Sequence, residues 1–173
     1  RHSVEPKVPP DAFADLAKLD DKAVKQVREE AWPTVRDPDE LHEALMSLSM
    51  LPVDMAAEWD RYTHGLVASN RAAVFVVNES GASHCYWIAA ERWPLVRAIF
   101  PEAHSEPPIK LPESLEQQWE RTDAIVELVR GTIDHSGPIT VQTIAERMQI
   151  RESMIAAALE ALEGHGVVIR GKF

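Results

Sequence analysis

The last fifty residues of the chain constrain its fold most, because their apolar spacing and their helix breaks follow the order of a helix-turn-helix. Apolar residues at positions i, i+3, i+4 and i+8 predict an amphipathic helix that buries one face. These residues are Ile125, Leu128, Val129 and Ile133. Ser136-Gly137-Pro138 then predicts the end of this helix, since glycine supplies a left-handed cap and proline cannot continue a helix.

Two shorter helices are expected after this break. Thr140 is a suitable N-cap for a second helix that holds Ile144 and Met148. A turn at 149–151 separates it from a third helix, whose apolar residues again have helical spacing and are expected in the core. The apolar residues of the third helix are Ile155, Ala158, Leu159 and Leu162.

The third helix is followed by the pattern of a short strand. Gly164 and Gly166 break the helix, and the β-branched run 167–169 predicts a strand. Phe173 ends the chain where the returning strand of a wing is expected to begin. One long helix, two short helices and a strand together predict a winged helix-turn-helix whose wing is truncated.

The first hundred residues predict a similar order. Two acidic amphipathic helices are expected before Trp32-Pro33, because a residue before proline is pushed out of helical geometry. Their apolar residues are Phe13, Leu16 and Leu19 in the first helix, and Val24, Val27 and Ala31 in the second. Asp37 or Asp39 can cap the next helix. That helix carries Leu41, Leu45, Leu48 and Leu51.

Two more short helices and a hairpin complete this first module. Pro52 opens one helix, and Trp59, Tyr62 and Leu66 mark another. The residues 74–77 and 84–88 predict two strands joined by a turn at 78–81, and a helix is expected from Ala90 to about Phe100.

The fold class predicted from these patterns is mainly α with small β wings (α+β), built as tandem winged helix-turn-helix modules. Residues 1–36 are predicted to form a helical arm and 37–101 a first winged-helix-like domain. The proline-rich stretch 102–115 is predicted to be a semi-rigid linker, and 116–173 a second winged-helix domain.

Composition and charge narrow the function classes. No apolar run is long enough to span a membrane, so no membrane partner is expected. The chain begins Arg1-His2-Ser3, without an initiator Met or a signal sequence, which suggests a fragment of a longer protein. The single cysteine, Cys85, excludes an internal disulfide and fits a cytoplasmic location.

The net charge of the chain is −10, whereas a free-standing nucleic-acid binder usually carries a positive net charge.

The residues that carry chemistry give no pattern of an active site. There is no glycine-rich loop that ends in Gly-Lys-Ser or Gly-Lys-Thr, so no nucleotide phosphate cradle is expected. His84 and Cys85 are adjacent in a predicted strand, so their side chains point to opposite faces and cannot bind one metal ion together. Cys85 is expected to be buried and inert. We therefore expect no catalytic, cofactor-binding or metal-binding residue in this chain.

A predicted winged helix suggests contact with DNA, because in DNA-binding winged helices the third helix enters the major groove. Four cations are expected to cluster near the start of that helix and the wing. These tentative DNA-binding residues are Arg147, Arg151, Arg170 and Lys172. The outward face of the helix also carries Glu152, Glu160 and Glu163, which repel phosphates. The alternative is that the four cations are ordinary surface charges.

Three segments resemble the region after the motor domains in the large helicase-related (Lhr) family. They are DPDELHEAL (37–45), WIAAERWP (87–94) and 162–173, which ends in GVVIRGKF, and the resemblance covers about 11–173. Members of that family are bacterial and archaeal superfamily 2 DNA helicases that use ATP, translocate 3′→5′ and are implicated in DNA repair. The resemblance implies that ATP and Mg²⁺ bind in motor domains of the parent protein. None of those motor motifs can be placed on this sequence.

Two function classes follow from these observations. The first is an accessory winged-helix region of an Lhr-type helicase, which scaffolds or extends the DNA path and has no ATPase site of its own. Its partners would be DNA, bound weakly, the other domains of the parent chain and, through self-association, a second copy. The second class is a protein-interaction, oligomerisation or regulatory winged-helix module without DNA contact, which the negative charge favours.

Overall fold

The first helices that the structure describes are one helix of the arm and the first helix of the first module. The computed structural model describes residues 21–79, 81–169 and 171. The predicted helix with Phe13 and Leu16 lies outside these residues, whereas the second predicted helix of the arm is α2 (Asp21–Ala31). The carboxylate of Asp37 accepts the N–H of Glu40 at 2.9 Å. Asp37, of the two candidates, is therefore the N-cap of α3 (Pro38–Leu48).

One residue of the predicted α3 stripe belongs to a different element. Ser49 adopts a positive φ of 65° and ends the helix. Leu51 was predicted on this helix, but it lies in the short strand β1 (Leu51–Pro52) and pairs with Trp87. A 3₁₀ helix, η1 (Val53–Trp59), and the helix α4 (Asp60–Ala68) follow, in agreement with the prediction of two further short helices.

The predicted hairpin is the centre of a four-stranded antiparallel sheet. Its strands are β2 (Ala72–Glu79) and β3 (Ala82–Ala89), both longer than predicted. The strand order is β1-β3-β2-β4. β4 (His104–Glu106) comes from the stretch that was predicted to be a linker, and it pairs with β2. Hydrogen bonding therefore ties part of this predicted semi-rigid linker to the sheet edge.

Alternation along the strands divides the apolar side chains between two cores. Phe75, Tyr86 and Ile88 point to one face, where they join a large cluster with residues from α5 to α8. Ala72 and Ala89 belong to the second cluster, which contains residues of α3, η1 and α4. Because both faces of the sheet are covered, the helices of the second module share a core with the sheet of the first.

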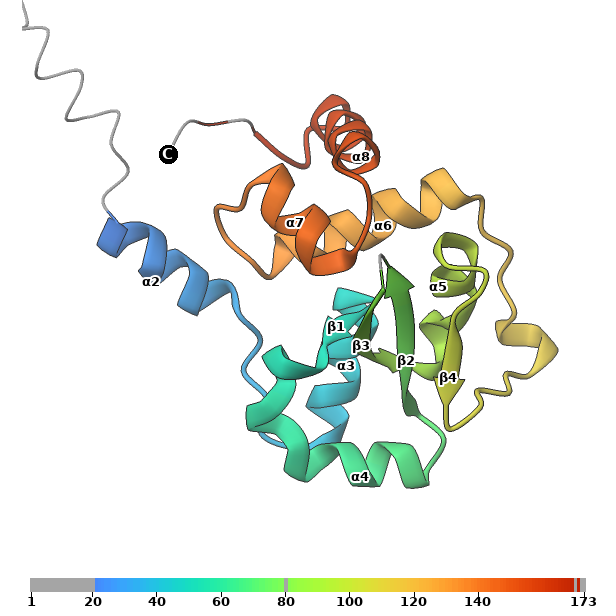
Figure 1. Cartoon of the computed structure of the whole chain (residues 1–173). Coiled ribbons are helices and arrows are strands. Elements are labelled where there is room, and N and C mark those ends of the chain that lie inside the picture. Colours follow the sequence, from blue (N-terminus) through green and yellow to red (C-terminus); the bar gives the residue numbers. More distant parts are fainter. Residues whose placement is uncertain (1–20, 80, 170, 172–173) are drawn as a thin grey trace, which may run out of the picture.

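The remaining elements build the helix-turn-helix on this shared core. Figure 1 shows α6, α7 and α8 together on one side of the sheet, with α4 at its opposite end. Their bounds, with those of the preceding short helices, are η2 (Ala90–Arg92), α5 (Trp93–Ile99), η3 (Glu113–Leu115), α6 (Arg121–Asp134), α7 (Val141–Met148) and α8 (Glu152–Gly164).

The chain after α8 differs from the prediction. The N–H of Gly166 donates to the carbonyl of Glu163 at 2.9 Å, and the N–H of Val167 to that of Leu162 at 2.9 Å. With φ of 72° at Gly166, this is a glycine-dependent helix cap, and it lies at the helix break that the sequence predicted. The run 167–169, however, does not form the predicted strand, because no described residue offers it a partner strand and the side chain of Ile169 is 95% exposed.

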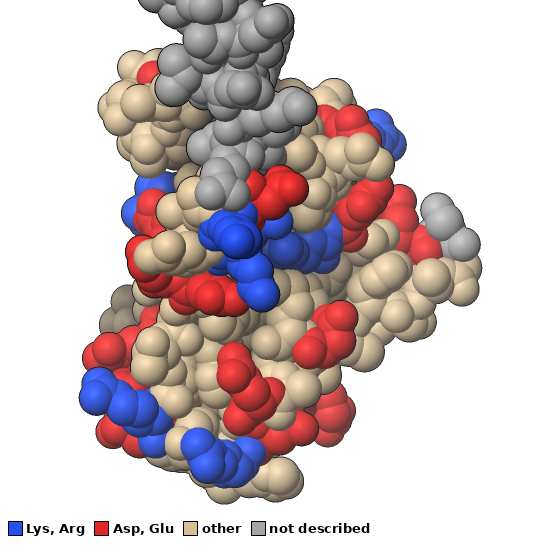
Figure 2. Space-filling model, turned by 90° about the vertical axis from the view of Figure 1, so that its left-hand side faces the viewer, with Lys and Arg blue, Asp and Glu red and all other residues tan. Residues whose placement is uncertain are grey.

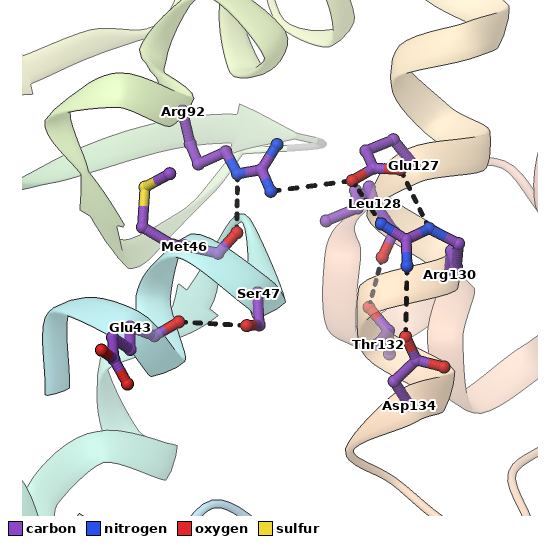
Figure 3. Close-up of polar contacts among 9 residues, drawn as sticks. All are labelled: Glu43, Met46, Ser47, Arg92, Glu127, Leu128, Arg130, Thr132 and Asp134. Carbon is purple, nitrogen blue, oxygen red and sulfur yellow. Dashed lines mark hydrogen bonds and ion pairs between the residues drawn. The ribbon is translucent and has the colours of Figure 1, made fainter. Parts of the chain in front are cut away.

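The first and second modules meet closely along α3 and α6. A Cβ atom placed on Gly131 of α6 would overlap the carbonyl oxygen of Ser47 in α3. Beside this contact, the Nε of Arg92 donates to the carbonyl oxygen of Met46 at 2.6 Å, and its guanidinium lies 3.6 Å from the carboxylate of Glu127 (Figure 3). A half-buried arginine from η2 thus bridges the two modules.

The fold is mainly helical with one small antiparallel sheet, and the predicted α+β class of tandem winged helix-turn-helix modules is confirmed. The order α3, η1, α4, β2, β3 forms the first module, and α6 to α8 form the helices of the second. No helix of the described residues is long and apolar enough to cross a membrane.

Candidate nucleic-acid interface

The helix-turn-helix is set by local capping and by a tight turn. The hydroxyl of Thr140 accepts the N–H of Thr143 at 3.1 Å and starts α7, as the sequence predicted. Gln149 takes a left-handed conformation, with φ of 53°, and Ile150 is buried. This turn brings Arg151 to the position just before α8, where its carbonyl accepts the N–H groups of Met154 and Ile155.

The exposed face of α8 has a mixed character. Besides the terminal Gly164, its exposed residues are Glu152, Ser153, Ala157, Glu160 and Glu163. Three of these five are acidic, and carboxylates on a groove-facing surface are repelled by phosphates. The helix therefore offers a poor surface for reading base edges, and a DNA contact would have to run through the cations near its start.

The structure describes two of the four predicted cations, and these two differ in their exposure to solvent. Arg151 is exposed at the start of α8. Arg147 is half-buried and lies in a groove between α7 and α2. The other two, Arg170 and Lys172, lie outside the described residues. A single cluster of all four cations therefore stays a prediction.

Arg147 is held where the second module meets the sheet. The buried hydroxyl of Tyr86 on β3 donates to the carbonyl oxygen of Arg147 at 2.8 Å, which fixes the end of α7. Burial lowers the pKa of the Arg147 guanidinium, the positive charge of Arg28 lowers it further, and Asp54 acts in the opposite direction. The guanidinium makes no hydrogen bond or ion pair with any residue that the structure describes.

We call the hollow that contains Arg147 the α2–α7 groove. It has a volume of about 490 Å³. It is lined by Lys25, Arg28, Glu29, Trp32, Met55, His135, Ser136, Pro138, Ile139, Thr143 and Arg147. On the face that α2 occupies, Figure 2 shows lysine and arginine atoms gathered in and beside a hollow, with acidic atoms around it. This protein of net charge −10 therefore carries a positive groove.

Two cations of this groove, Lys25 and Arg28, were missed by the sequence analysis. Both stand on α2. The packing of α2 against the turn before α7 brings them beside Arg147. A Cβ atom placed on Gly137 in that turn would lie 3.2 Å from Cγ1 of Val27 and 3.3 Å from the backbone nitrogen of Arg28. No sequence signal marks this contact.

The other side-chain chemistry points to no further site. Cys85 was expected to be buried but is exposed, because it lies toward the hairpin end of β3 on the strand face away from Tyr86. Within the described part of the chain, no three histidine, cysteine or acidic residues gather in a way that could hold a metal ion.

Comparison with known families gives one match. Residues 131–172 match the MarR family. The match spans the end of α6, both helices of the helix-turn-helix and the segment after α8, and it leaves the first module uncovered. It is a match to a winged-helix family, and it indicates a DNA-binding or regulatory winged-helix module. No curated protein sequence is significantly similar to the chain.

Proposed function

We propose that the chain is an accessory winged-helix region of an Lhr-type, ATP-dependent 3′→5′ DNA helicase. In this role it scaffolds the neighbouring domains or extends the path of the DNA, while ATP and Mg²⁺ are used by motor domains elsewhere in the parent protein. The observation that carries the DNA part is the winged-helix match over α7 and α8, since domains of the matched family bind DNA. The helicase part rests on the resemblance of residues 37–45, 87–94 and 162–173.

The arrangement around α8 supports a contact that is weak and independent of sequence. Arg151 stands exposed at the start of the helix, from which winged helices approach DNA, while Glu152, Glu160 and Glu163 disfavour deep insertion. The proposed partners are DNA and the other domains of the parent chain, together with a second copy of the chain. The proposed location is the bacterial cytoplasm.

A protein-interaction or regulatory module without DNA contact is the second candidate. The acidic residues on the exposed face of α8 and the net charge of −10 favour it. The two candidates differ in whether the isolated chain binds DNA at low ionic strength.

Fluorescence anisotropy with labelled single-stranded and tailed duplex DNA distinguishes them. We expect dissociation constants no tighter than tens of micromolar at physiological salt. Three or four phosphate contacts give a slope of about −2 to −4 for the logarithm of the binding constant against that of salt concentration. Arg151→Glu is expected to weaken binding to both DNAs, and the same change at Arg97, an exposed cation on α5, is the matched control.

Binding that is absent even at low salt would favour the protein-interaction module. Equal weakening by Arg151→Glu and Arg97→Glu would show that only the overall charge matters. Binding that survives both changes would remove the start of α8 from the DNA contact.

A further inference from the structure

Arg147 is an energetically unusual residue in this structure. A half-buried guanidinium loses much of its hydration, and proteins normally compensate such a charge with a carboxylate or several acceptors. Here no described residue accepts a hydrogen bond from it. The charge of Arg28 opposes its own, and Asp54, whose charge favours it, forms no ion pair with it. A cation kept in this setting without an internal partner is suited to an anionic ligand.

Arg28 is oriented toward the same groove by the turn before α7. Its Nε and Nη2 atoms donate to the carbonyl oxygen of Pro138 at 3.1 Å and 2.9 Å. These two bonds fix the plane of the guanidinium and leave its other N–H groups for a ligand. The close packing at Gly137 holds the backbone of α2 in place, so the position of Arg28 depends on the fold and not on a free side chain.

The charges that line the α2–α7 groove favour an anion. The charged residues that line it comprise three cations and one carboxylate. The cations are Lys25, Arg28 and Arg147, and the carboxylate is that of Glu29. Glu29 lies 3.7 Å from the Nζ of Lys25, on a strongly exposed pair that water screens. Two guanidinium groups at one hollow match the geometry of phosphate oxygens, which arginine binds through paired N–H donors.

We propose that the α2–α7 groove binds backbone phosphates of a DNA strand, with Arg28 and Arg147 as the direct ligands. The inference deepens the proposed function, on which it rests for the identity of the ligand, and adds the helical arm to the DNA path. The net charge of −10 disfavours DNA contact over much of the remaining surface, so the expected contacts are this groove and the exposed start of α8. On the far side of Arg147 an adjoining hollow is lined by Asp54 and Glu146, which limits the anion site to the α2 side.

The test is anisotropy with labelled single-stranded DNA at low and moderate salt, on the full chain and on single variants. Arg28→Gln and Arg147→Gln are each expected to lower the affinity about tenfold at low salt, as lost charge-assisted hydrogen bonds do. Each is also expected to reduce the salt slope by about 1. Arg97→Gln removes the same charge from α5 and is expected to change affinity little. Arg28→Lys keeps the positive charge but loses the paired N–H donors of the guanidinium. Its affinity for DNA is expected to lie between those of the unchanged chain and of Arg28→Gln.

A stability readout separates a ligand site from a structural role. Arg147→Gln removes a desolvated charge that has no described internal partner, so its melting temperature is expected to equal or exceed that of the unchanged chain. A lower melting temperature would show that Arg147 supports the fold and would overturn its assignment as a ligand.

The binding results distinguish this inference from the function on which it rests. DNA binding that is weakened by Arg151→Glu but not by Arg28→Gln or Arg147→Gln would overturn the groove and leave the helicase accessory role intact. An absence of DNA binding in the unchanged chain at low salt would overturn both.

Discussion

Gly131→Ala is expected to destabilise the protein, although alanine is the better helix former. Gly131 lies inside α6, where alanine alone would contribute up to about 1 kcal/mol. The added methyl group would overlap the carbonyl oxygen of Ser47, and no side-chain rotation can relieve a clash with backbone. Overpacking of this kind typically costs about 1–3 kcal/mol or more. We therefore expect a net loss in the free energy of unfolding, measured by urea denaturation.

Gly65→Ala is the matched control for this change. Gly65 also lies inside a helix, α4, but a Cβ atom there would meet nothing within 4 Å. This substitution is expected to raise the free energy of unfolding by up to about 1 kcal/mol. If Gly131→Ala also stabilised the protein, α3 and α6 could not be packed as described, and the shared core of the two modules would be wrong.

Ile155→Ala is expected to be the most damaging simple truncation in the helix-turn-helix. Ile155 is fully buried in the core that joins α8 to the sheet. Loss of its side chain removes apolar burial and leaves a cavity, which costs about 2–5 kcal/mol. The same change at Leu159, predicted in the core but found only partly buried beside an open apolar hollow, is expected to cost clearly less.

Denaturation midpoints of the two variants measure this difference directly. A larger loss for Leu159→Ala than for Ile155→Ala would mean that α8 is rotated about its axis relative to the structure. The helix face offered to DNA would then also change.

Local sequence signals were enough to predict most elements, because caps, turns and apolar spacing act within a few residues. The N-caps Asp37 and Thr140, the β2–β3 hairpin and the helix break at Gly166 all follow from such signals. The strands that were predicted incorrectly depend on partner strands that lie far away in the sequence. β4 forms only because β2 offers it an edge, and the run 167–169 remains without a described partner strand.

The candidate site could be predicted in part for the same reason. Arg147 and Arg151 could be proposed from the sequence because they belong to a recognisable helix-turn-helix. Arg28 could not be proposed from the sequence, since its place in the groove depends on α2 packing at Gly137, more than one hundred residues away in the sequence. The hollow that contains Arg147 is likewise lined by residues of α2, which lie far from it in the sequence.

The central claim is that this chain contributes to a DNA path through its winged-helix region. NMR titration of the isotopically labelled chain with tailed duplex DNA at low ionic strength tests it most directly. We expect the largest shifts on the Nε–H signals of Arg28, Arg147 and Arg151 and on the backbone amides between α7 and α8. An unchanged spectrum, or shifts centred on α4 or α5, would contradict it.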